Sequence, residues 1–268
     1  MSMFFRTLAS GSKGNSAVLS RGGTHILIDA GTSARRIRAG LSDSGLKPED
    51  ISAIVITHDH TDHISALPRL INYIDAPVFA PPKTAAAILR SAPCLSGRVE
   101  PMAAGDCVKS GEVTFRSFAT PHDAADSVGY VFTDGIVKFS YATDTGEVTE
   151  TMLEACLGAD MAVIEANHDR EMLLRGRYPD YLKRRILSPR GHLSNDDSGD
   201  FAARLWREGA GKLLLAHLSE ENNVPALSLR CVGEKLMSAG AVPGRDVCLS
   251  CAPASTPSEV FEVEKCSV

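Results

Sequence analysis

The sequence predicts one α/β domain, because short apolar runs typical of strands alternate with segments of helical spacing along most of its 268 residues. Charged residues make up 23% and hydrophobic residues 44% of the chain, as in soluble globular proteins, so a disordered or collagen-like chain is excluded. No run approaches the ~18 consecutive apolar residues that a membrane span needs. We therefore expect a protein without a membrane partner.

The net charge and the cysteines bear on the expected partners and on the expected cellular compartment. The net charge of -5 gives no global attraction to nucleic acid, although it leaves room for a local basic patch. Seven scattered cysteines suit a reducing cytoplasm better than a disulfide framework, and we expect no signal peptide. Cys248 and Cys251 form an isolated C-x-x-C in a strand-like stretch, which favours packing, with a second metal clip as the alternative.

In the first half of the chain, strands are expected to end at polar turns. The nearly continuous apolar run at 51–56 is typical of a buried strand, and the alanine-rich stretch at 84–90 favours a helix. The elements expected here are strands at 24–28 and 51–56, a helix at 64–74, a strand at 77–80 and a helix at 84–90.

In the second half, Asp134 and Gly135 between two apolar runs predict a hairpin. The elements expected here are strands at 113–119, 128–132, 136–141, 161–164 and 212–216, and helices at 195–208 and 226–239. We assign residues 1–252 to the domain and 253–268 to a loosely held tail rich in serine and proline, in which 260–263 could form an edge strand.

Six residues that can bind metal each follow one of the apolar runs. Loops at one end of the strands carry the ligand sites of α/β folds, so these side chains are expected to gather there. The six are Asp29, His58, His122, Asp144, Glu165 and His217.

The densest cluster reads H-x-H-x-D-H and lies between an expected strand and an expected helix. Three histidines and an aspartate in six residues cannot all be buried without a strong partner. A tight loop with this spacing can direct His58 and His60 at one ion and Asp62 and His63 at a second. The alternative is a solvated polar loop.

This motif, with Asp29 before it and His122, Asp144 and His217 after it, resembles the metallo-β-lactamase superfamily. The resemblance implies a four-layer αβ/βα sandwich with a two-metal cleft along one edge. It implies that one ion is held by His58, His60 and His122, and the other by Asp62, His63 and His217. It further implies that Asp144 bridges the ions and that Asp29 orients the histidine loop from behind.

A mixed set of histidines and carboxylates suits zinc or manganese, with iron as a third option, better than calcium or magnesium. Two such ions roughly 3.5–4 Å apart lower the pKa of a shared water and clamp both reacting oxygens. We therefore expect a hydrolase with two divalent cations.

The segment S-G-S-K-G-N-S near the start resembles one found in nucleic-acid-processing members of this superfamily. Small residues let backbone amides approach an anion, and hydroxyls add donors. The alternative is a plain turn. The residues expected to contact a substrate phosphate are Ser10, Ser12, Gly14 and Asn15.

Glu165 and His192 resemble a dyad of the tRNA 3′-processing branch of the superfamily. If that likeness transfers, Glu165 orients His192, which acts as the general acid. The alternative places His192 in the capping region of the next helix. We group His168 with them as a third catalytic candidate, either a phosphate contact, a residue beside the metals or a structural histidine. His25 receives no role.

Seven basic residues between 170 and 190 could contact a phosphate backbone, although a solvated helix face explains them nearly as well. The segments around Glu165, His192 and His217 resemble the YycJ/WalJ-like subgroup, which is associated with metal-dependent 5′→3′ exonuclease activity on DNA and with repair.

These observations predict a cytoplasmic phosphodiesterase that acts on nucleic acid, with DNA favoured over RNA. The expected activity is that of a 5′→3′ DNA exonuclease using a hydroxide activated by two metals. The alternative is a thioesterase or lactonase for small metabolites, which would give the Glu165–His192 pair no task. A binding protein without activity ranks last, because no position of the metal set is missing. The sequence does not predict an oligomeric state.

Overall fold

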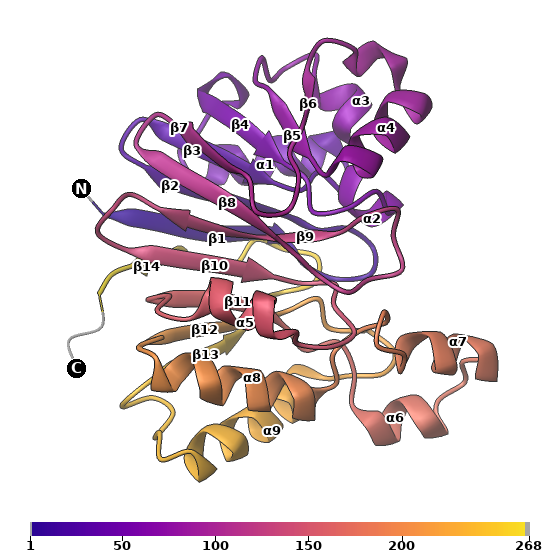
Figure 1. The fold of residues 1–268 in the computed structure, drawn as a ribbon, viewed down its shortest axis with the longest axis vertical. Helices are drawn as coiled ribbons and strands as arrows, with labels where there is room; N and C mark the ends of the chain where they lie inside the picture. The colour runs from indigo at the N-terminus through magenta and orange to yellow at the C-terminus, as the bar shows by residue number, and fades with distance from the viewer. Residues whose placement is uncertain (1, 266–268) are drawn as a thin grey trace.

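Two seven-stranded sheets face each other in the computed structural model, which describes residues 2–265 (Figure 1). In spatial order, the first sheet contains β14 (Phe261–Val263), β1 (Met3–Ala9), β2 (Ser16–Arg21), β3 (Thr24–Ile28), β4 (Ile51–Val55), β5 (Val78–Ala80) and β6 (Val99–Pro101). The second sheet contains β13 (Cys248–Cys251), β12 (Lys212–Ala216), β11 (Met161–Glu165), β10 (Lys138–Ala142), β9 (Val128–Thr133), β8 (Val113–Ala119) and β7 (Cys107–Ser110).

Each sheet is half parallel and half antiparallel. Strands β3 to β6 are parallel in the first sheet, as are β10 to β13 in the second. The other neighbours pair in antiparallel fashion. The parallel strands end at a common edge in each sheet, and this edge is where polar loop residues can meet.

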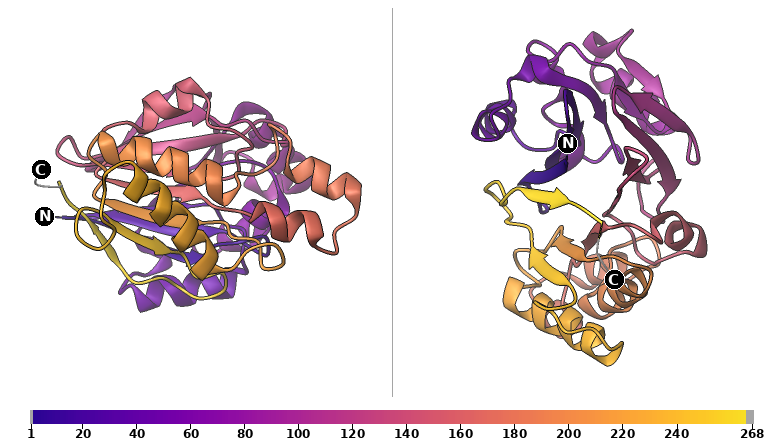
Figure 2. Two further views of the ribbon diagram at one scale, coloured as in Figure 1. Left: turned by 90° about the horizontal axis from the view of Figure 1, so that it is seen from below. Right: turned by 90° about the vertical axis from the view of Figure 1, so that its left-hand side faces the viewer.

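Helices cover the outer face of each sheet, so the fold has four layers (Figures 1 and 2). The first sheet is covered by α1 (Ala34–Asp43), α2 (Thr61–Ile64), α3 (Leu67–Leu70) and α4 (Pro82–Ser91). The second is covered by α5 (Glu150–Cys156), α8 (Asn195–Arg207) and α9 (Pro225–Ser238). Two further helices, α6 (Arg170–Arg175) and α7 (Asp180–Ile186), project from the body (Figure 1). This arrangement confirms the expected αβ/βα sandwich.

The core between the sheets is rich in aromatic side chains that are fully buried. Phe5 of the first sheet packs on Phe139 of the second with ring centroids 4.6 Å apart. Phe115, Tyr130 and Phe132 continue this cluster. Each such ring contributes roughly 1.5–3 kcal/mol by leaving water, so the two sheets form a rigid support for the loops at their edge.

The helix expected at 64–74 is wrong in its extent, because two short helices, α2 and α3, occupy this region. The amide of Ala66 donates to the carbonyl of Ala30 rather than continuing the first helix. Pro68 lacks an amide hydrogen and lies in the first turn of α3, where a new helix tolerates it. The bond to Ala30 ties this turn to the loop after β3.

Within the expected tail at 253–268, the structure confirms the edge strand expected at 260–263 and corrects the expectation of loose attachment for the described residues. Strand β14 pairs with β1 at the edge of the first sheet, in register from Met3–Val263 to Phe5–Phe261. Phe261 and Val263 are buried in the core between the sheets, and this burial holds the segment in place. Residues 266–268 of the expected tail lie outside the described residues.

Cys248 and Cys251 lie in β13, where residues three apart point to opposite faces of a sheet. Cys248 is exposed, whereas the thiol of Cys251 lies 3.4 Å from the hydroxyl of Ser228. This geometry agrees with packing and not with a shared metal clip. Within residues 2–265, none of the helices combines the length and the apolar character needed to cross a membrane.

Candidate metal centre

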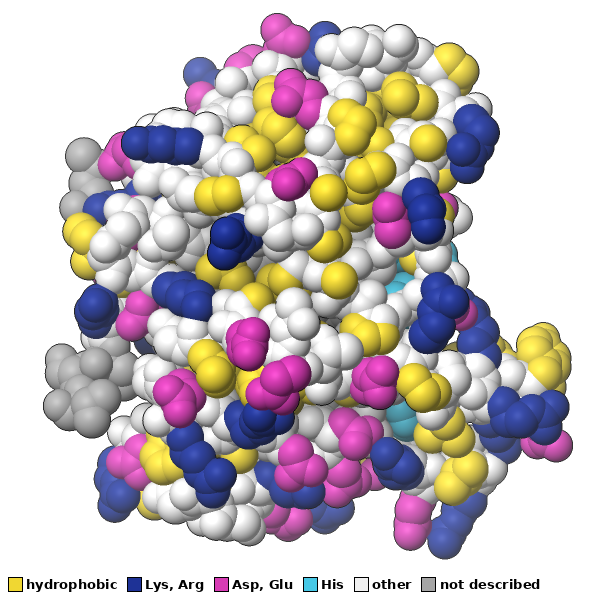
Figure 3. Space-filling view, viewed as in Figure 1, with side chains coloured by type: hydrophobic (Ala, Val, Ile, Leu, Met, Phe, Trp, Pro, Cys, Tyr) yellow, Lys and Arg dark blue, Asp and Glu magenta, His cyan; other side chains and the backbone are white. Residues whose placement is uncertain are grey.

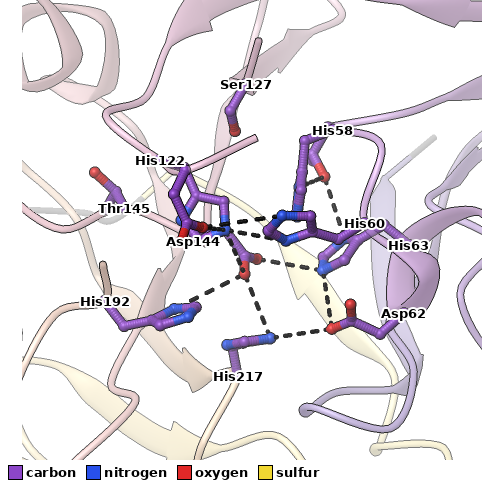
Figure 4. A network of polar contacts seen from close by, with 12 residues as sticks. His58, His60, Asp62, His63, His122, Ser127, Asp144, Thr145, His192 and His217 are labelled. Atoms are coloured by element: carbon purple, nitrogen blue, oxygen red, sulfur yellow. Dashed lines mark hydrogen bonds and ion pairs between the residues drawn. The ribbon is translucent and has the colours of Figure 1, made fainter. Parts of the chain in front are cut away.

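The loops at the common edge of the two sheets bring the candidate ligands together (Figure 4). His58 follows β4 and His122 follows β8, while Asp144 and His217 follow β10 and β12. Four overlapping groups have potential ligand atoms within 4.8 Å of one another. The groups are His58, His60 and His122; His58, His63 and Asp144; Asp62, His63 and His217; and Asp144, Glu165, His192 and His217.

Three residues at these strand ends adopt a left-handed backbone that residues other than glycine rarely take. The φ angles are 57° at Asp29, 58° at Asp144 and 56° at His217. Asp, Asn and His tolerate this region best among residues with a side chain, at a strain of order 1 kcal/mol or more. The strained turns direct these side chains back over the ends of their strands and toward one another.

Four buried histidines each have Nδ1 within hydrogen-bond distance of a neighbouring oxygen. This shared orientation of the rings is the main evidence for a metal centre. The Nδ1 of His122 donates to the carbonyl of Gly191 over 3.1 Å, and that of His63 donates to Asp29 over 2.8 Å. The Nδ1 of His217 lies 3.1 Å from Oε1 of Glu165, and that of His58 lies 3.0 Å from Oγ1 of Thr57. Bonds of this kind fix the tautomer and leave Nε2 as the ligand atom.

The first candidate group consists of His58, His60 and His122. The Nε2 of His122 lies 3.3 Å from Nδ1 of His60, within hydrogen-bond distance. The Nε2 of His58 is buried and has no hydrogen-bond partner among the described residues. A cation between these three nitrogens would satisfy all of them.

A second candidate group consists of Asp62, His63 and His217, and Asp144 lies between the two groups. Oδ2 of Asp62 lies 3.5 Å from Nε2 of His63 and 3.6 Å from Nε2 of His217. Oδ1 of Asp144 lies 3.4 Å from Nε2 of His217 and 3.9 Å from Nε2 of His122. Its Oδ2 lies 3.5 Å from Nε2 of His63. Asp144 therefore lies where a bridging carboxylate would be needed.

Asp29 is fully buried behind the histidine loop. Its Oδ1 accepts the amide of Thr57 over 2.8 Å, and its Oδ2 accepts the hydroxyl of the same residue over 2.9 Å. Because that hydroxyl donates to Asp29, it can accept from Nδ1 of His58. Asp29 thus orients His63 directly and His58 through Thr57. The importance of Thr57 carries no sequence signal beyond its place beside His58.

The charges of the cluster depend on its burial and on its mixed composition. Burial disfavours charge on His63, but the carboxylates of Asp144 and Asp29 raise its pKa to about 10. Burial likewise opposes charge on Asp62, yet hydrogen bonds from His217 and His63 hold its pKa below the usual range. Burial and the neighbouring His63 lower the pKa of His58 well below its ordinary value.

The donor set fits divalent cations, since these can replace protons shared between histidines and carboxylates. Besides Nε2 of His58, the buried atoms without a hydrogen-bond partner in the described chain include Oδ2 of Asp144 and Nε2 of His217. Unpaired buried polar atoms of this kind are destabilising unless a ligand satisfies them.

Glu165 and His192 form the expected pair, with Oε1 of Glu165 2.7 Å from Nδ1 of His192. Oε2 of Glu165 accepts the amides of Thr145 and Leu193 over 3.0 and 3.1 Å. Burial opposes the ionised form, but His192 holds the pKa of Glu165 below its usual range. His192 retains 16% side-chain exposure, and its Nδ1 lies 3.9 Å from Oδ1 of Asp144. Glu165 also contacts His217, a second task that the sequence did not reveal.

His168 lies apart from the groups that could hold a metal and lines a hollow behind His192. It is buried, and neither ring nitrogen has a hydrogen-bond partner within residues 2–265. Burial lowers the pKa of His168 to about 4, so the ring is neutral near pH 7. Of the roles weighed from sequence, this placement does not favour one beside the metals.

The segment from Ser10 to Asn15 largely supports the centre from within. The hydroxyl of Ser10 accepts the amide of His217 over 2.9 Å, and the buried Asn15 accepts the amide of Gly11. Nδ2 of Asn15 lies 2.9 Å from Nε2 of His63. Gly14 has a φ of 151°, and a Cβ there would lie 2.9 Å from the carbonyl of Gly31. Ser12 is exposed.

The basic run between 170 and 190 lies on α6, on α7 and in the loops between and after them, and part of its charge is paired. Arg170 pairs with Asp197 over 3.0 Å, and Arg185 bonds to Asp123 over 3.1 Å. Arg190 donates to the carbonyl of His122 over 2.8 Å, a positioning contact that its place in a charge run did not indicate. Part of this run therefore supports the fold instead of facing solvent.

The chain is similar in sequence and in fold to known proteins. The family described as the beta-lactamase superfamily domain matches residues 24–218. Exodeoxyribonuclease YycJ of Bacillus anthracis is 37% identical over 245 residues, covering 90% of this chain and 91% of that protein. Exodeoxyribonuclease WalJ of Streptococcus pneumoniae is 37% identical over 247 residues, with the same coverage of each. The metallo-beta-lactamase fold protein YhfI from Bacillus subtilis superposes with a TM-score of 0.71 at 17% identity, covering 98% of this chain and 100% of that one.

Proposed function

The chain belongs to the beta-lactamase superfamily, and from this premise we propose that it is a 5′→3′ exodeoxyribonuclease that requires two divalent metals. The observation that carries the proposal is the shared orientation of four buried histidines beside the Glu165–His192 pair. The first feature suits a dinuclear centre, and the second suits protonation of a poor leaving group such as an alkoxide.

We propose that His58, His60 and His122 hold one cation and that Asp62, His63 and His217 hold the other, with Asp144 between them. Zinc or manganese suits this mixture of imidazoles and carboxylates, and iron is also compatible with it. When bound, the two cations would lower the pKa of a shared water and neutralise charge on the phosphodiester. Asp29 and Thr57 keep the histidine loop in position for both.

We propose that His192 acts as the general acid. Glu165 holds Nδ1 of His192, so that Nε2 is the nitrogen left to give its proton to the departing oxygen. Glu165 is itself fixed by two backbone amides, which prevents it from moving when the charge of His192 changes. Loss of this proton donor would slow release of an alkoxide more than release of an acidic leaving group.

We propose that the DNA backbone also uses a basic hollow beside the histidine loop. This hollow of about 410 Å³ is lined by Lys13, Arg36 and Arg69 with the hydroxyls of Thr32, Ser33 and Ser65, and none of its described lining residues is acidic. Lys13 pairs with Glu220. Arg36 and Arg69, which form no ion pair among the described residues, suit a phosphate chain and explain how a chain of net charge -5 could bind DNA.

Further features of the proposal are DNA as the substrate in preference to RNA, a cytoplasmic location and a role in DNA repair. The names of the two relatives support DNA. A thioesterase or lactonase could use the same metals, but such a reaction leaves Glu165 and His192 without a task.

The test is digestion of single- and double-stranded DNA, labelled at the 5′ or the 3′ end, with Zn²⁺, Mn²⁺ or Mg²⁺. We expect early release of a labelled mononucleotide from the 5′ label. His58→Ala should reduce the rate at least about 100-fold, because a ligand is lost. His25→Ala is the matched control, since His25 is half-buried in β3 and lies outside the candidate groups. A wild-type rate for His58→Ala, or turnover of acyl glutathione with inert DNA, would contradict the proposal.

A further inference from the structure

A second hollow of about 300 Å³ opens directly beside His192, and no part of the proposed reaction has yet used it. In the space-filling view, histidine surface is visible in the recess on the right-hand side of the molecule, between the two halves of the fold (Figure 3). The hollow combines apolar and polar walls. Its lining includes Val148, His168, Leu187, His192, Leu193 and Phe201.

Four of the five charged residues that line this hollow pair with a neighbour, and the fifth, Glu147, is an exposed carboxylate with no ion pair among the described residues. Arg170 pairs with Asp197 over 3.0 Å, and Asp200 pairs with Lys235 over 2.8 Å. Arg204 pairs with Glu150 over 3.4 Å. A phosphate would have to break one of these pairs to gain a cation. The hollow therefore suits an uncharged group with apolar faces and a few hydrogen-bonding edges.

His168 lines this hollow with a polar side chain whose ring nitrogens have no hydrogen-bond partner among the described residues. The side chain is 1% exposed, and both ring nitrogens lack a partner among the described residues. A neutral imidazole offers one donor and one acceptor. Leaving both unused in a buried position is destabilising, so the arrangement is best explained by a ligand that pairs with them. Nucleobases and deoxyribose present donors and acceptors on apolar rings.

We propose that this hollow is a nucleoside subsite that receives the 5′-terminal nucleoside as it leaves, with His168 hydrogen-bonding to it; this inference rests on the proposed exonuclease function. Water adds to the phosphorus and the bond from phosphorus to the terminal 3′ oxygen breaks. That oxygen takes the proton of His192. The terminal nucleotide then departs with a 3′ hydroxyl, and the remaining strand keeps a 5′ phosphate.

The position of His192 determines which side of the phosphodiester enters the hollow. The group attached to the protonated oxygen must lie on the His192 side, and the hollow is the space that lines this side. In Figure 4, His192 and Asp62 lie on opposite sides of His217. The basic hollow borders the loop of Asp62, since Gly31 in its lining contacts the Asp62 backbone. The remaining strand would thus extend toward Lys13, Arg36 and Arg69.

The experiment compares single-stranded DNA ending in an ordinary 5′ nucleoside with the same strand ending in an abasic 5′ sugar. Wild-type protein should process the ordinary end about tenfold faster in kcat/KM, the value of roughly one net hydrogen bond with some stacking. His168→Phe replaces the imidazole with an apolar aromatic ring that has no nitrogen, so it should reduce this preference toward one. Leu187→Trp, at a 38% exposed residue, should fill the hollow and have the same effect.

His25→Phe is the matched control and should keep the full preference, because His25 lies on β3 away from this hollow. Equal rates of wild-type protein on both ends, or an unchanged preference in both His168→Phe and Leu187→Trp, would overturn the subsite while leaving the nuclease intact. Inert DNA with every metal would instead refute the proposed function, and the subsite with it.

Discussion

Replacing Glu165 with glutamine should disable the centre in two ways at once. Oε2 of Glu165 accepts two backbone amides, so the single oxygen of the glutamine must occupy that position. The amide nitrogen then faces Nδ1 of His192, which is 2.7 Å away from Oε1, and Nδ1 of His217, which is 3.1 Å away. Both ring nitrogens would have to accept hydrogen bonds instead of donating them.

The consequence differs for the two histidines. His217 would carry its proton on Nε2, the nitrogen that faces Asp62 and Asp144, and could no longer offer a lone pair to a cation there. We expect metal affinity to fall about 10–100-fold, as for other losses behind a ligand. His192 would lose the acceptor that holds its Nδ1–H and orients the ring, and the rate at saturating metal should fall roughly 10²–10⁴-fold.

Two assays separate these effects. Calorimetric titration of metal into the metal-free protein gives the affinity, and kcat on labelled single-stranded DNA at saturating Mn²⁺ gives the chemical step. Glu150→Gln, which removes a 73% exposed carboxylate, should change neither. Wild-type values of both quantities in Glu165→Gln would refute the argument from tautomers.

Three further outcomes are expected. The double variant Arg36→Gln with Arg69→Gln should weaken DNA binding and reduce the slope of log affinity against log salt by about 1–2, with kcat unchanged. The control is Arg35→Gln, which lies on the same helix as Arg36 but outside the basic hollow and should leave the slope unchanged. Asp29→Asn should lower metal affinity about 10–100-fold while keeping the left-handed backbone, which asparagine tolerates; unchanged affinity by calorimetry would argue against its orienting role. The metal-free protein should lose stability as pH rises from about 6.5 toward 10, because the pKa of His63 is raised to about 10 in the folded state. Protonated His63 stabilises the fold fully only below its unfolded-state pKa, and this stabilisation is lost as pH approaches the folded-state pKa. The free energy of unfolding, measured with denaturant across this range, should therefore fall, and a flat profile would contradict the prediction.

The sequence predicted well which candidate ligands lie together, because the signals for them are local in the chain. The motif from His58 to His63 lies in one loop, and the other candidates each follow an apolar run that could be recognised alone. Since parallel strands end at a common edge, the grouping of these residues followed from the strands themselves. Contacts behind the cluster were not predictable, because the bond from Arg190 to His122 joins residues 68 positions apart.

The errors in the fold have a similar origin. The break between α2 and α3 depends on a hydrogen bond to Ala30, far from the apolar periodicity that suggested a continuous helix. The tail segment at β14 is fixed by β1, at the other end of the chain, and its own serine- and proline-rich composition suggested looseness. The contacts of Ser10 with His217 and of Asn15 with His63 also join distant segments and were not foreseen, while the phosphate role expected for this segment stays a prediction.

The left-handed backbone at the strand ends sets the stability of the fold against the proposed activity. Glycine at position 144 would relax the backbone by about 1 kcal/mol and remove a buried carboxylate oxygen that lacks a hydrogen-bond partner in the described chain. The same change would remove the proposed bridging group. Selection for thermal tolerance in metal-depleted medium would thus favour inactive descendants, and engineering for robustness should hold Asp144 constant.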